Sequence, residues 1–394
     1  MVKNGGDKKY DSQTLISAAH QSTQSDTVLQ PDCQNCFPIH SSHHTDANPS
    51  ESILKLPLNI SDFSIALRHS SPHFIDLTSE SLNKRPLRAT HELTESLLSS
   101  AASISPKFFY NALGSKLFEA ITGLSEYYPT RTEASIFSEC HAQIATAVRK
   151  AGINNTCLID LGAGNCGKAM TLIPHLTPDQ YVPIDISVDF LKDAAEQVQL
   201  SFPKLDILGL GMDFSTELVL PDPVQNHDRV FFYPGSSLGN FSPDEALPFL
   251  QRIADPAQGH ASGLLLGIDL VKDSTTLQEA YDDALGVTAA FNKNVLLNVN
   301  ECLQTDFDVR QWRHVAIFNT EQSRIEMHLE SLCSLTVSWP GHKRLFAAGE
   351  RIHTESSYKY TLPSMTALLK QAGFNHVEQW SDPKSWFAVF WASV

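Results

Sequence analysis

The sequence predicts a doubly wound α/β protein with a second, smaller lobe inserted into it, and three features support this prediction. Short apolar runs alternate with helix-like segments between residues 156 and 271, a pattern that is typical of a parallel sheet with connecting helices. The first run leads into a glycine-rich turn, LIDLGAGNCGKA, from Leu158 to Ala169. The alternation stops after Asp273 and returns near the C-terminus. Such folds bind ligands at the carboxyl ends of their strands, so the turns there are the first candidates for a site.

Composition argues against several classes of protein. The chain has 394 residues, of which 44 are acidic and 29 basic, giving a formal net charge of -15. This charge offers little attraction to nucleic-acid phosphates. No stretch approaches the roughly 20 apolar residues of a membrane span, and the start MVKNGGDKKYDSQ lacks the apolar core of a signal peptide. We expect a cytoplasmic protein that binds neither nucleic acid nor membrane, and we expect it to be a monomer.

The N-terminal residues 1–60 are rich in small polar side chains, which predicts a disordered tail. This tail contains two cysteines and three histidines with a zinc-like spacing, namely Cys33, Cys36, His40, His43 and His44. Because the segment offers few apolar anchors for a folded site, we interpret the spacing as chance and predict no metal. The seven cysteines are odd in number and scattered, so they do not predict a disulfide framework.

Two helical segments are predicted before the alternating region. The first, SPKFFYNALGSKLFEAIT, begins at Ser105, and the second, PTRTEASIFSECHAQIATAVRKAG, has a capping box of Thr130 and Glu133 and a stop at Gly152. The predicted strands that follow are TCLIDLG, QYVPIDIS, LDILGLGMDF, RVFFYPGS and GLLLGIDLV. The predicted helices between them are KAMTLIPHL, VDFLKDAAEQVQLSF and PDEALPFLQRIA.

The second lobe is predicted from the change of pattern after the last of these strands. Residues 276–303 indicate a helix that is interrupted near Gly286, and the stretches RIEMHLESLCSLTVSW and SYKYTL indicate strands. The final thirty residues return to helix, strand, turn and apolar strand, which would complete the main sheet. Beyond the tail, the predicted divisions are a first part of the second lobe at 61–134, the nucleotide-binding sheet at 135–272, the inserted lobe at 273–360 and the completing segment at 361–394.

The glycine turn predicts a nucleotide site. Gly162, Gly164 and Gly167 have the spacing of a dinucleotide turn, and Asp185 ends the next strand 21 positions beyond Gly164, where such folds place an acid on the ribose hydroxyls. A dinucleotide therefore remains possible. The pair Asp213 and Phe214 after the third strand shifts the balance toward S-adenosylmethionine, because an acid and an aromatic ring suit the adenine amino group and face. An acid at the start of a helix is an equally good interpretation of Asp213.

A serine hydrolase is the rival class of enzyme. GSSLG, from Gly235 to Gly239, matches the nucleophile elbow with Ser237 at its centre, directly after a predicted strand. An elbow requires the helix to begin at the turn, whereas the helix-start signature lies at Ser242, Pro243 and Glu245. The context therefore argues against a hydrolase.

From about Ser105 to Val394, roughly three quarters of the chain, the sequence resembles the S-adenosylmethionine-dependent L-histidine Nα-methyltransferases of ergothioneine biosynthesis. The shared motifs occur in the order of that family and are FFYNALGSKLFEAIT, EYYPTRTEA, GSSLGN, IDLVKD, AYDDALGVTAAFNKNVL, RIEM and TESSYKY. The resemblance implies a Rossmann-like methyltransferase domain with a substrate-binding lobe. It also implies three methylations of the α-amino nitrogen of histidine, which give hercynine.

The resemblance implies roles for individual residues as well. Tyr127 and Tyr281 would hold the histidine carboxylate, and Asn240 would meet the amino nitrogen. The residues that would read or line the imidazole site are Glu355, Ser357, Met327, Thr288 and Phe291. Tyr110 would lie close to the amine. The methyl-donor site would contain Gly162, Gly164, Lys168, Asp185, Asp213 and Phe214.

Each assignment has an alternative on the residues alone. Tyr281, Leu285, Thr288 and Phe291 have the spacing of a helical core stripe, Asn240 could cap the next helix, and Glu355 could be a surface acid. At the level of function, the alternatives are a methyltransferase for another amino acid, such as a tryptophan derivative, and a donor-binding protein without catalysis. The retention of Glu355 and Met327 favours histidine. One departure from the family is Asn165 and Cys166 in the glycine turn, where small hydroxyl residues are common.

Overall fold

The computed structural model describes residues 71–77, 85–153, 156–216, 218–221, 224, 228–255 and 262–394. The chain divides into two units, Met1–Ile65 and Ala66–Val394, and every described residue belongs to the second. The predicted tail at 1–60 and its cysteine and histidine cluster lie outside the described residues.

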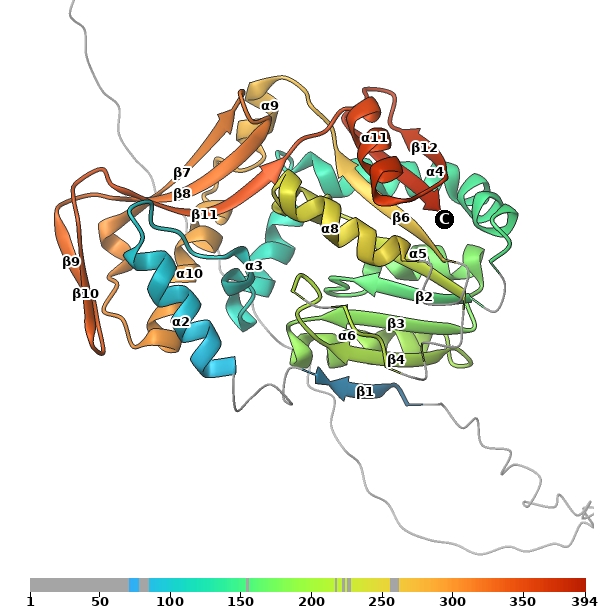
Figure 1. Ribbon diagram of the computed structural model, residues 1–394, viewed down its shortest axis with the longest axis horizontal. Coiled ribbons are helices and arrows are strands. Elements are labelled where there is room, and N and C mark those ends of the chain that lie inside the picture. Colours follow the sequence, from blue (N-terminus) through green and yellow to red (C-terminus); the bar gives the residue numbers. More distant parts are fainter. Residues whose placement is uncertain are drawn as a thin grey trace, which may run out of the picture. The chain divides into compact units, whose positions relative to one another are not determined.

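The main element is an eight-stranded sheet in the order β1-β4-β3-β2-β5-β6-β13-β12 (Figure 1). Its first six strands in that order are parallel, whereas β13 pairs antiparallel with β6 and β12 antiparallel with β13. Strand order reverses at β2, because β3 lies on one side of it and β5 on the other. Doubly wound sheets bind ligands at the carboxyl ends of strands at such a reversal. The strands are β1 (His73–Asp76), β2 (Thr156–Leu161), β3 (Gln180–Asp185), β4 (Asp206–Gly211), β5 (Asp228–Tyr233), β6 (Ser262–Asp269), β12 (His376–Ser381) and β13 (Phe387–Ser393).

Helices cover both faces of this sheet, which explains why its central strands are continuous apolar runs. Successive residues of β2 point to opposite faces, so Ile159 packs with α8 and α11 while Leu158 packs with α4, α5 and α6. Both side chains are completely buried. These helices are α4 (Tyr128–Lys150), α5 (Gly167–Leu176), α6 (Val188–Ser201), α8 (Pro243–Ala254) and α11 (Leu362–Ala372).

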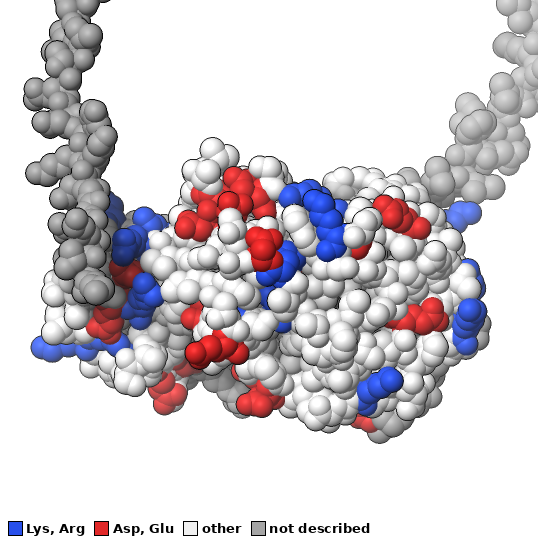
Figure 2. Space-filling view, turned by 90° about the horizontal axis from the view of Figure 1, so that it is seen from above, with Lys and Arg blue, Asp and Glu red and all other residues white. Residues whose placement is uncertain are grey.

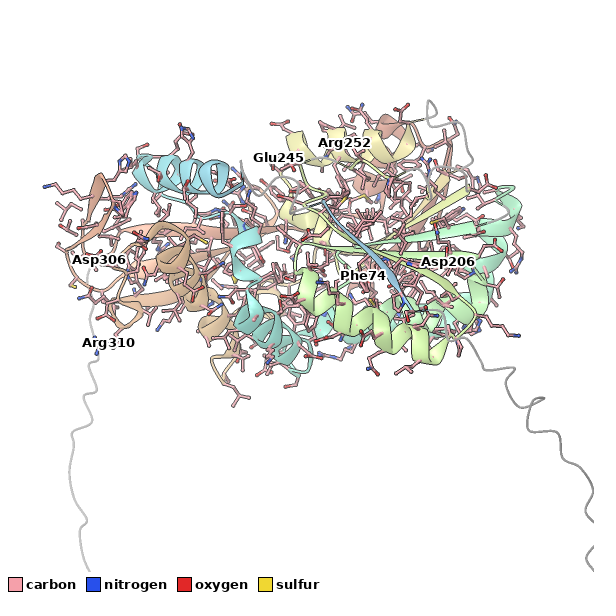
Figure 3. All side chains as sticks on the ribbon, turned by 90° about the horizontal axis from the view of Figure 1, so that it is seen from below. Phe74, Asp206, Glu245, Arg252, Asp306 and Arg310 are labelled. Carbon is pink, nitrogen blue, oxygen red and sulfur yellow. The ribbon has the colours of Figure 1, made fainter. Side chains whose placement is uncertain are left out.

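Strand β1 extends the sheet beyond β4 and was not predicted. It pairs in parallel with β4, and the ring of Phe74 lies over Gly209, where an added Cβ would come within 2.4 Å of the ring (Figure 3). Residues 73–76 therefore belong to the main sheet, although the sequence assigns 61–134 to the second lobe. The other division points stay predictions.

The second lobe has a core of its own, built around the buried rings of Trp312 and Phe346, whose centroids are 5.1 Å apart. Among the described residues, it combines the three-stranded antiparallel sheet β7-β8-β11 and the hairpin β9-β10 with four α-helices and two short 3-10 helices (Figure 1). The predicted fold class, a doubly wound α/β sheet with an additional lobe, is confirmed. The lobe's elements are α2 (Arg85–Leu98), η2 (Pro106–Phe109), α3 (Ala112–Thr122), α9 (Ser274–Glu279), α10 (Val287–Leu303), η5 (Val309–Gln311), β7 (Trp312–Asn319), β8 (Arg324–Ser331), β9 (Leu335–Trp339), β10 (His342–Phe346) and β11 (Arg351–Tyr358).

Two helix boundaries can be compared with the predictions, namely a helix break near Gly286 and a helix start at a capping box of Thr130 and Glu133. The break near Gly286 is confirmed, because α10 begins directly after this residue, which has a φ of 75°. The capping box at Thr130 is wrong, since α4 begins at Tyr128. Its presumed partner Glu133 is instead 1% exposed and accepts a hydrogen bond from the backbone N–H of Gly235 at 2.8 Å.

The surface charges are mixed. On the face in Figure 2, Lys and Arg side chains are scattered among Asp and Glu and form no continuous basic stripe. Within the described ranges, no helix has both the length and the apolar character needed to cross a bilayer. The same residues contain no group of three His, Cys, Asp or Glu side chains arranged to hold a metal ion.

Candidate active site

The turn after β2 is held against the end of β3. Gly162 and Gly164 have φ values of 72° and 53°, which glycine adopts without strain. The N–H of Gly164 donates to the carboxylate of Asp185 at 3.0 Å, and the N–H of Ser187 donates to the other oxygen at 2.9 Å. Burial raises the pKa of Asp185. Each carboxylate oxygen retains acceptor capacity, because an oxygen has two lone pairs.

The segment after β4 supplies an aromatic ring, Phe214, and a second acid, Asp213, near the same turn. A Cβ at Gly162 would lie 3.8 Å from the ring of Phe214, so glycine lets this ring approach the backbone. One oxygen of Asp213 accepts from the N–H of Ser215 at 3.2 Å, and the other lies 3.9 Å from Nζ of Lys107. Residues 214–216 form a turn, so Asp213 does not begin a helix.

Lys168 lies in the first turn of α5, and its Nζ is 2.6 Å from Oε2 of Glu133. A Cβ at Gly267 would come within 1.9 Å of the Glu133 carboxylate, so glycine is required there. Next to this pair, Asp160 of β2 accepts a hydrogen bond from the hydroxyl of Tyr181 at 2.8 Å. Burial raises the pKa of Asp160 to about 7. Six residues are predicted to bind the methyl donor. We call them, together with Asp160 and Glu133, the glycine-turn cluster; the six are Gly162, Gly164, Lys168, Asp185, Asp213 and Phe214.

Strand β11 arranges a second group of side chains. A bulge between His353 and Glu355 shifts its pairing with β8, and bulges re-aim the side chains that follow them. Beyond the bulge, Glu355 lies opposite Met327, and Glu355 and Ser357 share a face of the strand. The hydroxyl of Tyr281 donates to Oγ of Ser357 at 2.8 Å.

The Glu355 carboxyl is buried, with 8% of the residue exposed. Burial raises its pKa to about 7, and the nearby charge of Lys359 offsets only part of this shift. None of the described residues donates a hydrogen bond to this carboxyl. The surface-acid interpretation of Glu355 is therefore wrong, and the site presents an acceptor without a donor.

Aromatic rings surround this acceptor. The centroids of Tyr127 and Tyr281 are 6.2 Å apart in an edge-to-face arrangement. Phe291 stacks on Phe109 at 4.5 Å and meets Tyr110 edge-on at 5.9 Å. We call Tyr110, Tyr127, Tyr281, Glu355, Ser357, Met327, Thr288 and Phe291 the tyrosine-glutamate cluster; Thr288 is 2% exposed and lies in the first turn of α10.

Tyr110 connects the two clusters. Burial raises the pKa of its phenol, and the charges of Glu355, Tyr127 and Asp185 raise it further, because all three lie near it. Its backbone carbonyl accepts a hydrogen bond from the hydroxyl of Ser187 at 2.9 Å, and Ser187 follows Asp185 of the glycine-turn cluster by two residues. The residues predicted to bind the methyl donor and those predicted to bind the substrate therefore lie on either side of Tyr110.

Asn240 ends the short helix η3 (Ser237–Asn240). It does not cap the next helix, because Ser242 and Glu245 form the capping box of α8. A Cβ at Gly239 would lie 2.8 Å from the carbonyl oxygen of Tyr358, so η3 packs closely on the end of β11. The helical-stripe alternative also fails, since Leu285 is 80% exposed.

The turn that contains Ser237 is not a nucleophile elbow. The hydroxyl of Ser237 donates to the carbonyl of Pro234 at 3.1 Å, and no histidine among the described residues hydrogen-bonds to it. Positive φ occurs at Gly235 and at Ser236, at 78° and 60°, and Oγ of Ser236 accepts from the N–H of Asp269 at 2.9 Å.

The doubly wound sheet, the glycine turn and the second lobe fit the class of S-adenosylmethionine-dependent methyltransferases, and the sequence comparison shows that class. The sequence model of one family in this class, described as histidine-specific and SAM-dependent, matches residues 89–394. The chain belongs to this family, and its methyl donor is S-adenosylmethionine.

Three relatives show the range of the similarity. The chain is 38% identical over 299 residues to a histidine N-alpha-methyltransferase of Mycolicibacterium smegmatis, which covers 74% of this chain and 91% of that protein. It is 29% identical to ergothioneine biosynthesis protein 1 of Neurospora crassa, over 69% of this chain and 31% of that protein. It is 23% identical to a 4-dimethylallyltryptophan N-methyltransferase of Penicillium roqueforti, over 74% of this chain and 89% of that protein.

Proposed function

We propose that this protein methylates the α-amino nitrogen of L-histidine three times and so forms hercynine, a step of ergothioneine biosynthesis. The observation that carries the proposal is the buried carboxyl of Glu355, which has no donor and shares its strand face with Ser357. An imidazole N–H would donate to this carboxyl, which receives no hydrogen bond from the described residues. The similarity to a histidine N-alpha-methyltransferase supports the same substrate.

The glycine-turn cluster fits the donor. S-adenosylmethionine supplies an activated methyl group when it is bound. The open backbone at Gly164, beside which a Cβ would meet nothing within 4 Å, leaves room for a ligand against the turn. We assign Asp185 to the ribose hydroxyls, Phe214 and Asp213 to the adenine, and Gly162 and Lys168 to the remaining part of the donor.

The tyrosine-glutamate cluster fits a zwitterionic amino acid. Phenols donate hydrogen bonds without adding charge, so Tyr127 and Tyr281 suit a carboxylate. Glu355 and Ser357 suit the imidazole, with Met327, Thr288 and Phe291 around the ring. Asn240, on the helix that packs on the end of β11, suits the amine. The chain's main contribution to rate is alignment of the amine, because well-oriented reactants gain several kcal/mol, about 7–11 in favourable cases.

The amine must lose a proton before each methyl transfer, in which a C–N bond forms as the C–S bond of the donor breaks. The phenol of Tyr110 is affected by the charges of both Glu355 and Asp185, which supports binding of this amine by its hydroxyl. Its raised pKa makes a phenolate scarce at neutral pH. We therefore propose that Tyr110 orients the amine and that water at Asn240 takes the proton.

Aromatic neighbours explain how one site accepts successive products. Each methylation removes a hydrogen-bond donor from the nitrogen, and the last leaves a fixed cation. The rings of Tyr110, Tyr127 and Phe291 interact favourably with such a cation without requiring a donor. The cytoplasmic location and the monomeric state predicted from the sequence are retained as part of this proposal.

A tryptophan derivative is the second candidate substrate, because a relative at 23% identity is named for one. Indole has one N–H and stays neutral, whereas a protonated imidazole offers two N–H donors and a positive charge to the carboxyl of Glu355. The acidic side chain therefore favours histidine over an indole substrate.

The test is to incubate the purified protein with S-adenosylmethionine and L-histidine and to locate the methyl groups by mass spectrometry and NMR. We expect all of them on the α-nitrogen. Glu355→Ala should lower kcat/KM for histidine about tenfold or more, the cost of one charged hydrogen bond. Glu321→Ala, which changes an exposed turn, is the matched control and should behave as the wild type. Methylation of the ring nitrogens would refute the assignment.

A further inference from the structure

A buried lysine connects the end of β6 to the tyrosine-glutamate cluster. The side chain of Lys359 is 0% exposed, and its Nζ lies 2.8 Å from Oδ2 of Asp269. The same ammonium group donates to Oγ of Ser357 at 2.7 Å and to the hydroxyl oxygen of Tyr281 at 3.1 Å. An ammonium group has three N–H donors, so Asp269, Ser357 and Tyr281 use all the donors of Lys359; we call these four residues the Lys359 network.

Asp269 cannot balance the charge of Lys359 by itself, because it is shared. Lys272 lies 2.5 Å from its other oxygen, and the hydroxyl of Tyr128 donates to the same carboxylate at 2.7 Å. Burial would raise the pKa of Asp269, but Lys359 and Lys272 together lower it. Two buried lysines thus depend on one aspartate, and only Lys359 also contacts the tyrosine-glutamate cluster.

The other acidic side chains near this network do not fully balance the positive charge of Lys359. Asp382 acts on Lys272, and its carboxylate accepts from the backbone N–H groups of Lys384 and Trp386. Glu355 acts on Lys359, but a carboxyl whose pKa is raised to about 7 is only partly ionised at neutral pH. A substrate carboxylate at Tyr281 would provide the missing negative charge.

The hydrogen bonds at Tyr281 allow this exchange. In the structure its hydroxyl donates to Ser357 and accepts from Lys359. If the phenol turns its proton toward a carboxylate, Ser357 keeps its bond to Lys359 and is not left without a donor. A phenol that accepts from an ammonium group is also a stronger donor, because hydrogen bonds in a chain polarise one another.

We propose that Lys359 is a positioning residue that makes the enzyme selective for amino acids with a free carboxylate, acting through the hydroxyl of Tyr281. The inference rests on the proposed function, because it requires the carboxylate of the amino acid to lie at Tyr281. Lys359 and Glu355 give the cluster one basic and one acidic side chain. Lys359 beside Tyr281 would fix the orientation of the bound substrate, with its carboxylate toward Tyr281.

The experiment compares the binding of L-histidine and L-histidinamide, which differ only in the carboxylate, to enzyme saturated with S-adenosylhomocysteine. Calorimetry should give the wild type an affinity for histidine about tenfold or more above that for histidinamide. Lys359→Met should weaken histidine binding by about the same factor and leave histidinamide within about twofold. A merely structural role would weaken both ligands equally, and that result overturns the inference.

Lys272→Met is the matched control, since it removes the other lysine on Asp269 without touching Tyr281 or Ser357, and the preference for histidine should persist. If Lys359→Met does not fold, as judged by circular dichroism, Lys359→Gln gives the same comparison with a shorter neutral side chain. Equal affinity of the wild type for both ligands also overturns the inference, with no variant needed. A wild type that methylates histidine but lacks the preference refutes the role of Lys359 alone, whereas one that binds neither ligand refutes the proposed function as well.

Discussion

At the scale of single residues, the buried carboxyl of Glu355 lowers the unfolding free energy at neutral pH and provides an acceptor for the substrate. Its carboxyl is buried without a donor, and its pKa is raised from 4.5 to about 7. The folded protein therefore holds this proton more tightly than the unfolded chain does. The resulting stabilisation is complete below pH 4.5 and is lost as the pH rises through about 7. A residue that costs stability at working pH is typical of a functional site.

Glu355→Gln should remove this pH dependence. Relative to the variant, the wild type should lose up to about 3 kcal/mol of unfolding free energy between pH 4.5 and pH 8, because only the wild type must ionise a buried carboxyl. Urea denaturation of ligand-free protein at both pH values measures the difference. An unchanged difference between wild type and variant would contradict the assignment, and Glu321→Gln provides the background for an exposed acid.

The sequence predicts some site residues better than others for a physical reason. Glu355 and Ser357 stand two apart in a strand, so their shared face could be predicted, and Lys359 continues the same period. The strand period does not predict which side chains face these residues. The partners of Lys359, Asp269 and Tyr281, come from segments distant in sequence. Glu133 was interpreted as a cap because a local pattern cannot reveal that a glycine at 267 makes space for it.

At the scale of elements, η3, which ends at Asn240, is in close contact with the end of β11 in the second lobe, and we propose that this contact positions Asn240. The contact depends on Gly239, where a Cβ would lie 2.8 Å from one backbone atom of Tyr358 and 3.3 Å from another. Neither atom belongs to a flexible side chain, so a larger residue must separate the two elements.

Gly239→Ala should therefore lower stability by about 1–3 kcal/mol and reduce kcat for histidine, because Asn240 moves with the helix. Thermal denaturation and steady-state kinetics measure the two effects. Gly123→Ala is the matched control: its φ is -87° and the nearest atom to an added Cβ is 3.4 Å away, so its change should stay within about 0.5 kcal/mol. Equal behaviour of the two variants would argue against the contact as the support of Asn240.

Elements with strong periodicity were predicted correctly, including β12 at one edge of the main sheet, whereas the short strand β1 at the other edge was not. The strands of the main sheet and the break at Gly286 follow from apolar runs and a turn residue. Strand β1 has only four residues, and its place depends on Phe74 meeting Gly209, a contact between segments that are distant in sequence. The start of α4 was misplaced because Thr130 and Glu133 imitate a capping box.

At the scale of the whole molecule, the two clusters come from different lobes and meet through Tyr110 and Ser187. All predicted site residues lie between Tyr110 and Ser357, and the family match begins at residue 89. The unit Ala66–Val394 therefore contains every residue to which the account gives a role.

A chain of residues 66–394 should methylate histidine with the kcat of the full protein. A chain of residues 85–394, which lacks β1, should be less stable by about 1–3 kcal/mol, because the edge of β4 and the surface at Gly209 become exposed. Urea denaturation and kinetics on both chains measure this. Loss of activity in the longer chain would assign a role in catalysis to residues before Ala66.

The most direct measurement for the central claim is mass spectrometry of the purified protein incubated with S-adenosylmethionine and an equimolar mixture of the twenty amino acids. We predict that histidine alone gains up to three methyl groups and that Glu355→Ala lowers this selectivity. Methylation of another amino acid with histidine unchanged would contradict the proposed substrate while leaving the methyltransferase family in place.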